Sequence, residues 1–189
     1  MDWQEFRENL FEKSSWAFNL SKVVVVLVII ILLTHFFIAT IFVVSGGSME
    51  PNFNNGEYLL INRLVHNFKR GDVIGFYYPG QPSEKYIKRV IGLPGEKIKI
   101  NKNKVIIYNR KNPDGFVLDE SFYLPSDNFT QGNKTWQVSD DEYFVMGDNR
   151  GNSSDSRIWS TLPAKYIVGR AVLVLWPIKD ISIINRIGY

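Results

Sequence analysis

A run of 22 residues without Lys, Arg, Asp or Glu, from Val23 to Val44, constrains this chain more than any other feature of its sequence. As a helix that rises 1.5 Å per residue, the run would be about 33 Å long, which is enough to cross a bilayer core. The sequence therefore predicts one transmembrane helix over 23–44. A cleaved signal peptide is the alternative, but its apolar core has only about 7 to 15 residues.

The charges on the two sides of this run predict its orientation. Arg7, Lys13 and Lys22 precede the run, whereas the 18 residues that follow it contain neither Lys nor Arg. Because positive charge is retained on the cytoplasmic side, we expect residues 1–22 in the cytoplasm and residues 45–189 outside it. The chain would then be a single-pass protein of the cell membrane with an extracytoplasmic domain.

The residues before the run combine charges with apolar side chains at about helical spacing. This pattern predicts a short amphipathic segment over 1–22 that lies at the cytoplasmic interface. The apolar residues concerned are Trp3, Phe6, Leu10, Phe11, Trp16 and Phe18.

The composition fits one globular domain in addition to the anchor, because the chain has 189 residues and 45% hydrophobic content. The absence of cysteine excludes thiol nucleophiles, thiolate metal sites and disulfides. Only His35 and His66 could supply imidazole chemistry, and we assign no role to His35 within the apolar run. The net charge of +3 is mild and the cations have acidic neighbours, so nucleic acid is not the favoured partner.

The region after the run has the pattern of an antiparallel β domain, because β-branched and aromatic runs are separated by turn residues. The predicted strands are 57–63, 73–78, 85–91, 97–100, 104–108, 142–146 and 167–176. A short polar connection joins 97–100 and 104–108 as a hairpin. We expect an extended loop layer over 109–136 and one short helix near 163–166. The fold class is therefore mainly β.

A serine between glycines and a proline comes directly after the apolar run, in Ser45-Gly-Gly-Ser-Met-Glu-Pro51. Gly46 and Gly47 give access to backbone conformations closed to other residues, and the proline stiffens the backbone on its carboxyl side. The hydroxyl of Ser48 could thus be held on a tight turn, as a nucleophile requires. An ordinary flexible linker between membrane and domain is the alternative.

Lys88 is the second residue of interest, because strand alternation places Lys88 on one face of 85–91 and Arg89 on the other. One face of this strand must therefore accept a cation whichever way the strand turns. Burial would lower the pKa of a lysine, which lets it act as a general base for a serine. The alternative is a solvated face, with Lys85, Lys88 and Arg89 all in water.

The third feature is a loop over 146–157 in which two acids and two arginines are interleaved with glycines and hydroxyls. Its charged residues are Asp148, Arg150, Asp155 and Arg157. Bidentate ion pairs among them could lock the loop, and a locked loop could hold a serine hydroxyl against another site residue. A calcium loop is the alternative, but the arginines oppose cation binding and a closing glutamate is missing.

Together these three motifs resemble the bacterial type I signal peptidases, a family of membrane-anchored Ser/Lys endopeptidases. The motifs stand in the family's order and the resemblance covers most of residues 23–176. They read Ser45-Gly-Gly-Ser-Met-Glu-Pro51, Tyr86-Ile-Lys-Arg-Val-Ile-Gly-Leu-Pro-Gly95 and Gly147-Asp-Asn-Arg-Gly-Asn-Ser-Ser-Asp-Ser-Arg157.

The resemblance implies that Ser48 is the nucleophile and that Lys88 is the general base, which takes the serine proton and later serves the leaving amine. It gives Ser153 the role of orienting this base. The oxyanion would be held by the backbone N–H of Ser48, whereas Gly46 stands where some members carry a second hydroxyl. The charged residues would brace their loop in two pairs, Asp155 with Arg157 and Asp148 with Arg150.

The resemblance also implies that the substrates are secretory preproteins, which the family cuts after the small-x-small pattern that ends a signal peptide. The bilayer would be the second partner, no metal or cofactor is implied, and no oligomeric state is indicated. A membrane-tethered binding domain without catalysis is one alternative, although both the serine and the lysine are present. A self-cleaving Ser/Lys protease is the other, and the transmembrane span argues against it.

We also expect an apolar surface that brings the serine to the membrane. The residues expected to be exposed there are Met49, Phe53 and 76–78, with Trp159 or Trp176 at headgroup depth.

Overall fold

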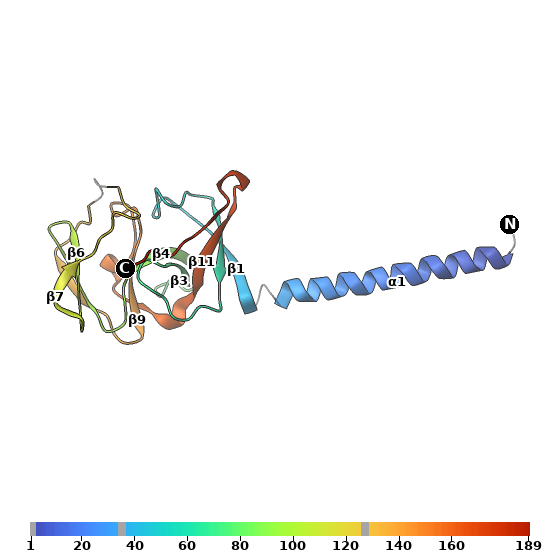
Figure 1. Ribbon diagram of the computed structural model, residues 1–189, viewed down its shortest axis with the longest axis horizontal. Helices are drawn as coiled ribbons and strands as arrows, with labels where there is room; N and C mark the ends of the chain where they lie inside the picture. The colour runs from blue at the N-terminus through green and yellow to red at the C-terminus, as the bar shows by residue number, and fades with distance from the viewer. Residues whose placement is uncertain (1–2, 34–36, 126–128) are drawn as a thin grey trace. The chain divides into compact units, whose positions relative to one another are not determined.

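The computed structural model describes residues 3–33, 37–125 and 129–189, with the side chains of residues 4–15 outside this description. The chain divides into two units, residues 1–39 and residues 40–189, and each is described by itself below (Figure 1).

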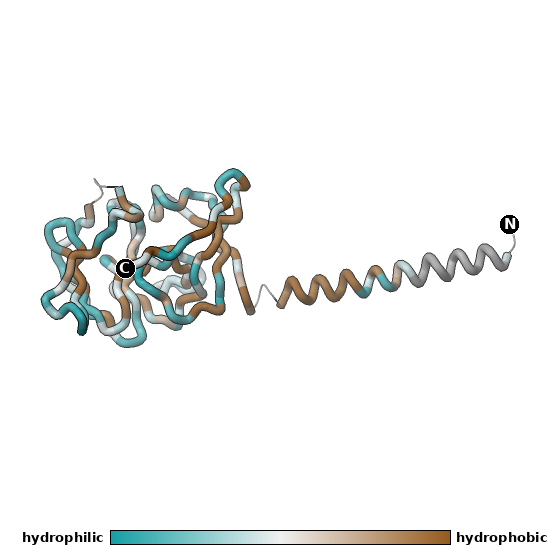
Figure 2. The backbone as a smooth tube through the Cα atoms, in the orientation of Figure 1, coloured by the Kyte–Doolittle hydropathy of each residue, from teal (hydrophilic) through white to brown (hydrophobic). Residues whose placement is uncertain are grey.

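The first unit contains one long helix, α1, over Trp3–Leu33. Its second half is apolar, as Figure 2 shows, and Trp16–Leu33 has the length and mean hydropathy of a membrane span. The backbone from Trp3 onward belongs to this single helix, so the predicted segment 1–22 is not a separate element. Its predicted interfacial position stays a prediction.

The prediction of one helix over 23–44 is wrong at its carboxyl end. Helix α1 ends at Leu33, and strand β1 occupies Ala39–Val43. The alternating burial of a strand is evident there, because Phe42 is 2% exposed and Ile41 is 44% exposed. This end of the run is therefore apolar because it packs into the core of the second unit. His35 and the two residues beside it lie outside the described residues.

The second unit contains two antiparallel sheets, which confirms the predicted fold class. The larger sheet has the order β1-β2-β11-β3-β4-β9-β10, with β12 paired to β11. Its strands are β2 (Tyr58–Asn62), β3 (Val73–Tyr77), β4 (Lys85–Gly92), β9 (Glu142–Met146), β10 (Leu162–Pro163), β11 (Ile167–Trp176) and β12 (Ser182–Ile183). The short helices are α2 (Ser156–Trp159), η2 (Ala164–Tyr166) and η3 (Ile178–Asp180).

The smaller sheet has the order β7-β6-β5-β8. Its strands are β5 (Lys97–Asn101), β6 (Lys104–Asn109), β7 (Asn112–Val117) and β8 (Lys134–Gln137). The predicted loop layer over 109–136 is therefore partly wrong, since it contains β7 and the start of β8. Turn-forming residues dominate Asn112–Val117, but pairing of Phe116 with Ile107 on β6 overrides that local preference.

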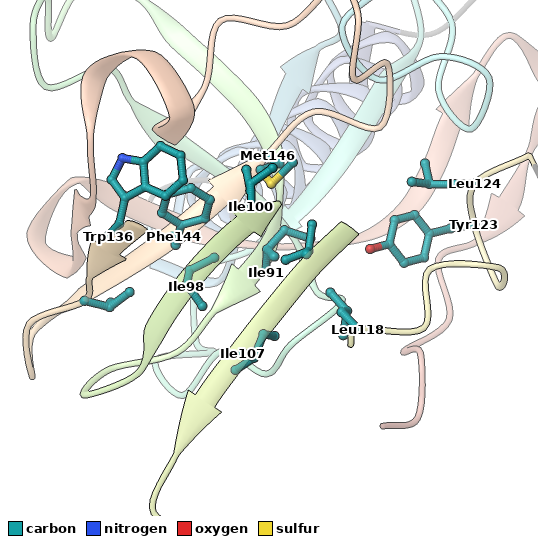
Figure 3. Packing of buried hydrophobic residues seen from close by; sticks show 12 residues of the cluster. Ile91, Ile98, Ile100, Ile107, Leu118, Tyr123, Leu124, Trp136, Phe144 and Met146 are labelled. Carbon is teal, nitrogen blue, oxygen red and sulfur yellow. The ribbon is translucent and has the colours of Figure 1, made fainter. Parts of the chain in front are cut away.

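A shared apolar core joins the two sheets, as Figure 3 shows. Ile91 of β4 and Phe144 of β9 lie in one buried cluster with Ile98 of β5 and Trp136 of β8. The Trp136 and Phe144 rings are 5.0 Å apart between centroids. Tyr123 and its neighbour Leu124, from the connection between β7 and β8, belong to the same cluster. The smaller sheet is thus packed onto β4, which carries Lys88, and onto β9, which leads into the 146–157 loop.

The expected exposure of Met49, Phe53 and Phe76 is wrong, because all three are buried. The second unit instead exposes apolar residues on β1 and around the turn between β11 and β12. They are Ile41, Val43, Trp176, Ile178, Ile181 and Ile183.

Candidate active site

The serine turn is anchored within the second unit. Met49 and Phe53, on either side of the proline, are buried in its core. Gly46 has a φ of 78°, and its N–H donates to Asn55 Oδ1 at 2.8 Å. The amide of Phe53 donates to the carbonyl of Met49 at 3.0 Å. These contacts argue against a flexible linker and hold Ser48 on a defined turn.

Lys88 reaches this turn from β4. Its Nζ atom lies 2.7 Å from Ser48 Oγ and donates to the carbonyl of Ile87 at 3.0 Å. The residue is only 4% exposed, and burial lowers the pKa of Lys88 to about 8, although the charges of Asp155 and Asp148 oppose this shift. The alternative of a solvated face is excluded for Lys88 and Arg89, which are both buried, while Lys85 is exposed.

Asp155 and Arg157 form a buried ion pair, as the sequence predicted. Arg157 Nε donates to Asp155 Oδ1 and Nη2 donates to Asp155 Oδ2, each at 2.8 Å. The N–H of Gly147 also donates to Oδ2, at 3.0 Å, and Asp155 caps α2. Burial alone would raise the pKa of this carboxyl, but the hydrogen bonds from Arg157 and Gly147 lower it below its ordinary value.

The predicted pairing of Asp148 with Arg150 is wrong. Asp148 pairs with Arg89 instead, through Nε to Oδ1 at 2.8 Å and Nη2 to Oδ2 at 2.5 Å. The register explains the proximity, because Arg89 lies opposite Met146, the last residue of β9, and Asp148 follows only two residues later. Arg150 pairs with Glu120, whose Oε1 accepts from Nη2 at 2.5 Å.

Ser153 lies next to this site, but its predicted contact with the base is absent. In the described part of the chain Lys88 Nζ contacts Ser48 and Ile87, and no hydrogen bond joins it to Ser153. Ser153 Oγ is buried against Gly147, where an added Cβ would clash with it. The orienting role of Ser153 stays a prediction.

Two asparagines that were not among the predicted site residues hold the serine turn against the loop. Asn149 donates its backbone N–H to the carbonyl of Ser48 at 3.1 Å and its Nδ2 to the carbonyl of Gly47 at 2.9 Å. Asn52 Nδ2 donates to Asp148 Oδ2 at 2.9 Å and to the carbonyl of Tyr123 at 2.7 Å. Asn149 lies inside the third motif. That motif was recognised by its alternating acids and arginines, and an uncharged amide adds nothing to such a pattern.

Ser48 and Lys88 face a cleft of about 460 Å³. It is lined by Val43, Val44, Ser45, Ser48, Met49, Glu84, Lys85, Tyr86, Ile87, Lys88 and Ser154. Strand β9 pairs with β4 only at Arg89, Val90 and Gly92, so 85–88 has no described strand partner on that side. An extended peptide could add to this free edge.

Among the described residues, no group of three or more His, Cys, Asp or Glu side chains is placed to hold a metal ion.

Comparison with known proteins shows that this chain is a peptidase. Residues 17–176 match the family "Signal peptidase, peptidase S26". The chain therefore belongs to the signal peptidase I family, whose members are membrane-associated and cleave signal peptides from preproteins.

Several relatives carry this name. The signal peptidase I of Leptolyngbya laminosa is 33% identical over 162 residues, which cover 80% of this chain and 73% of that protein. The signal peptidase I of Bacillus amyloliquefaciens is 33% identical over 151 residues, which cover 77% of this chain and 80% of that protein. A crystal structure of a signal peptidase I from Enterococcus faecalis V583 aligns with a TM-score of 0.45 and 26% identity, over 55% of this chain and 96% of that chain.

Proposed function

We propose that this protein is a membrane-anchored serine endopeptidase in which Ser48 is the nucleophile and Lys88 the general base. The observation that carries the proposal is the 2.7 Å separation of Lys88 Nζ and Ser48 Oγ, with the lysine buried. A lysine whose pKa is lowered to about 8 has an appreciable neutral fraction near pH 8, and only the neutral amine can accept a proton.

The reaction would proceed in two steps. Ser48 Oγ attacks the carbonyl carbon of the scissile bond while Lys88 takes the serine proton, and the resulting ammonium then protonates the leaving amine. A water molecule, deprotonated by the same lysine, then attacks the carbonyl carbon of the acyl-enzyme. The bond to Ser48 Oγ breaks, and the Lys88 ammonium returns its proton to that oxygen, which restores both side chains. The Ser48 N–H would stabilise the oxyanion, and Gly46 offers no side-chain donor for it.

The cleft beside Ser48 suits the end of a signal peptide in an extended conformation. The free edge of 85–88 provides backbone partners for an added strand, and Val43, Val44 and Ile87 supply apolar contacts for small side chains. We propose that the preferred site is small-x-small, as in Ala-x-Ala.

The membrane arrangement is part of the proposal. Helix α1 would cross the bilayer within Trp16–Leu33, an 18-residue stretch of about 27 Å, with its amino end and the charge of Lys22 directed toward the cytoplasm. This span replaces the predicted 23–44, and residues 40–189 would be the extracytoplasmic catalytic domain.

The purified full chain in lipid vesicles, incubated with a preprotein that carries an Ala-x-Ala site, tests the dyad. We expect Ser48→Ala and Lys88→Ala each to lower kcat by several orders of magnitude while the circular dichroism spectrum stays that of the folded protein. Since the two side chains act as a unit, the double variant should be no worse than either single variant. Near-normal turnover in either single variant would refute the dyad.

A further inference from the structure

The loop that carries the third motif depends on a counter-charge from a distant part of the chain. The side chain of Arg150 is 0% exposed, and its carboxylate partner Glu120 is 14% exposed. Glu120 Oε2 accepts from Arg150 Nη1 at 3.1 Å, which makes the pair bidentate with the 2.5 Å contact already described. Thr130 Oγ1 accepts from the same Nη1 at 2.5 Å. Glu120 and Thr130 both lie between β7 and β8 of the smaller sheet.

Arg150 in turn closes the turn on which the serine rests. Its Nε donates to the carbonyl of Gly147 at 3.0 Å. Gly147 packs so closely against Ser48 that an added Cβ would clash with the Ser48 carbonyl oxygen. Asn149, within the same turn, donates to the carbonyls of Gly47 and Ser48. The position of Ser48 therefore depends on the turn 147–150, and that turn depends on Arg150.

Glu120 also positions Tyr123, whose ring lies against the guanidinium of Arg89. Tyr123 OH donates to Glu120 Oε1 at 2.8 Å, and the Arg89 guanidinium lies 4.3 Å from the Tyr123 ring centroid. Figure 3 shows Tyr123 beside Leu124, and both side chains are buried in the cluster that joins the sheets. One carboxylate thus connects the smaller sheet to Arg150 and, through Tyr123, to Arg89.

We propose that Glu120 is a positioning residue for the peptidase reaction, which holds Arg150 so that the turn 147–150 keeps Ser48 aligned with Lys88. The proposal rests on the proposed roles of Ser48 and Lys88. Glu120 does not line the cleft, so its loss should lower kcat and leave KM nearly unchanged. A displacement of about 1 Å at a reacting group can cost roughly 100-fold in rate.

The test compares Glu120 with a matched ion pair elsewhere in the second unit. Glu96 also forms a buried bidentate pair, with Arg70 at 2.7 and 2.9 Å, but that pair makes no described contact with the serine turn. In the full chain in lipid vesicles we expect Glu120→Ala to lower kcat about 10- to 100-fold. Its KM should change less than about twofold. Glu96→Ala should lower Tm while kcat, measured well below that Tm, stays within about twofold of wild type.

Two milder variants cover the case in which Glu120→Ala does not fold. Glu120→Gln keeps an acceptor but loses the charge, and Thr130→Val removes only a hydroxyl, so both should lower kcat less than Glu120→Ala does. The proposal is overturned if kcat of the folded Glu120 variants is within about twofold of wild type. It is also overturned if KM alone changes, or if Glu96→Ala lowers kcat equally. Ser48→Ala in the same assay separates the two proposals, because an active Ser48→Ala would refute the dyad itself.

Discussion

At the scale of single residues, two adjacent cations on β4 have opposite roles because their partners differ. Burial would lower the pKa of Arg89, but the hydrogen bonds that it donates to Asp148, and the charge of that carboxylate, raise it above its ordinary value, so Arg89 is a permanent structural cation. Lys88 is equally buried but hydrogen-bonds a hydroxyl and a carbonyl, and no carboxylate accepts from its Nζ in the described part of the chain. Its pKa therefore falls to about 8. The structure keeps the arginine charged and lets the lysine become neutral.

The lowered pKa of Lys88 predicts a stability cost. Between about pH 8 and 10.5 the unfolded chain binds more protons at this residue than the folded chain does, so wild-type stability should rise with pH across that window. At pH 7 the fold carries the cost of a buried ammonium, so Lys88→Met should be more stable than wild type by up to about 3 kcal/mol. It should also be inactive.

Thermal unfolding of both proteins at pH 7 and near pH 10.5 measures this difference. The advantage of Lys88→Met should shrink at the higher pH. An equal difference at the two pH values would mean that Lys88 is not a buried, titrating cation.

At the scale of elements, β1 shows where hydropathy stops being informative. A charge-free run of 22 residues satisfies the length rule for a membrane helix, but it contains the end of α1 and the edge strand of a sheet. Thr40, Ile41 and Val43 are β-branched and favour a strand, but inside a long apolar run this preference does not distinguish a strand from a membrane helix. Only the pairing of β1 beside β2 settles the local structure.

A matched pair of substitutions on β1 tests this assignment. Phe42→Ala removes a buried ring and should cost about 3–5 kcal/mol of unfolding free energy in the second unit. Ile41→Ala, on the exposed face, should cost less than about 1 kcal/mol. Similar small effects for both would indicate that residues 39–43 do not pack in the core and belong to the anchor after all.

The sequence predicted β2, β3, β4, β5, β6, β9 and β11 because their β-branched and aromatic runs are bounded by turn residues. It predicted Ser48 and Lys88 as a pair only through the order of three motifs, since neither residue's burial can be deduced locally. It gave no site role to Glu120 or Asn52, because contacts across 30 and 96 positions follow from sheet packing and leave no local pattern. It mispaired Asp148 for the same reason, because the register of β4 and β9 decides that contact.

At the scale of the whole molecule, the second unit exposes apolar residues on β1 and around the turn between β11 and β12. Figure 1 shows β1 and the end of β11 near one side of this unit, with β6 and β7 near the other. The exposed residues of β1 and of the turn between β11 and β12 form one candidate lipid-contacting surface. It would keep the catalytic domain at the bilayer independently of α1.

Vesicle sedimentation of residues 37–189 tests this surface. The double variant Ile178→Ser/Ile183→Ser should bind vesicles several-fold more weakly than the parent, with an unchanged circular dichroism spectrum, because it removes two exposed apolar side chains. Val117→Ser, at another exposed apolar position, on β7, is the control and should bind as the parent does. If the parent does not sediment with vesicles, α1 alone provides membrane proximity.

The pH dependence of kcat/KM tests the central claim, that Lys88 is the general base for Ser48. The assay uses the full chain in lipid vesicles with an Ala-x-Ala preprotein at fixed ionic strength, from pH 6 to 11. We predict that kcat/KM rises as the lysine loses its proton, with an apparent pKa of about 8, and reaches a plateau above it. A rise that begins only near pH 10.4, the value of a solvated lysine, would contradict the account.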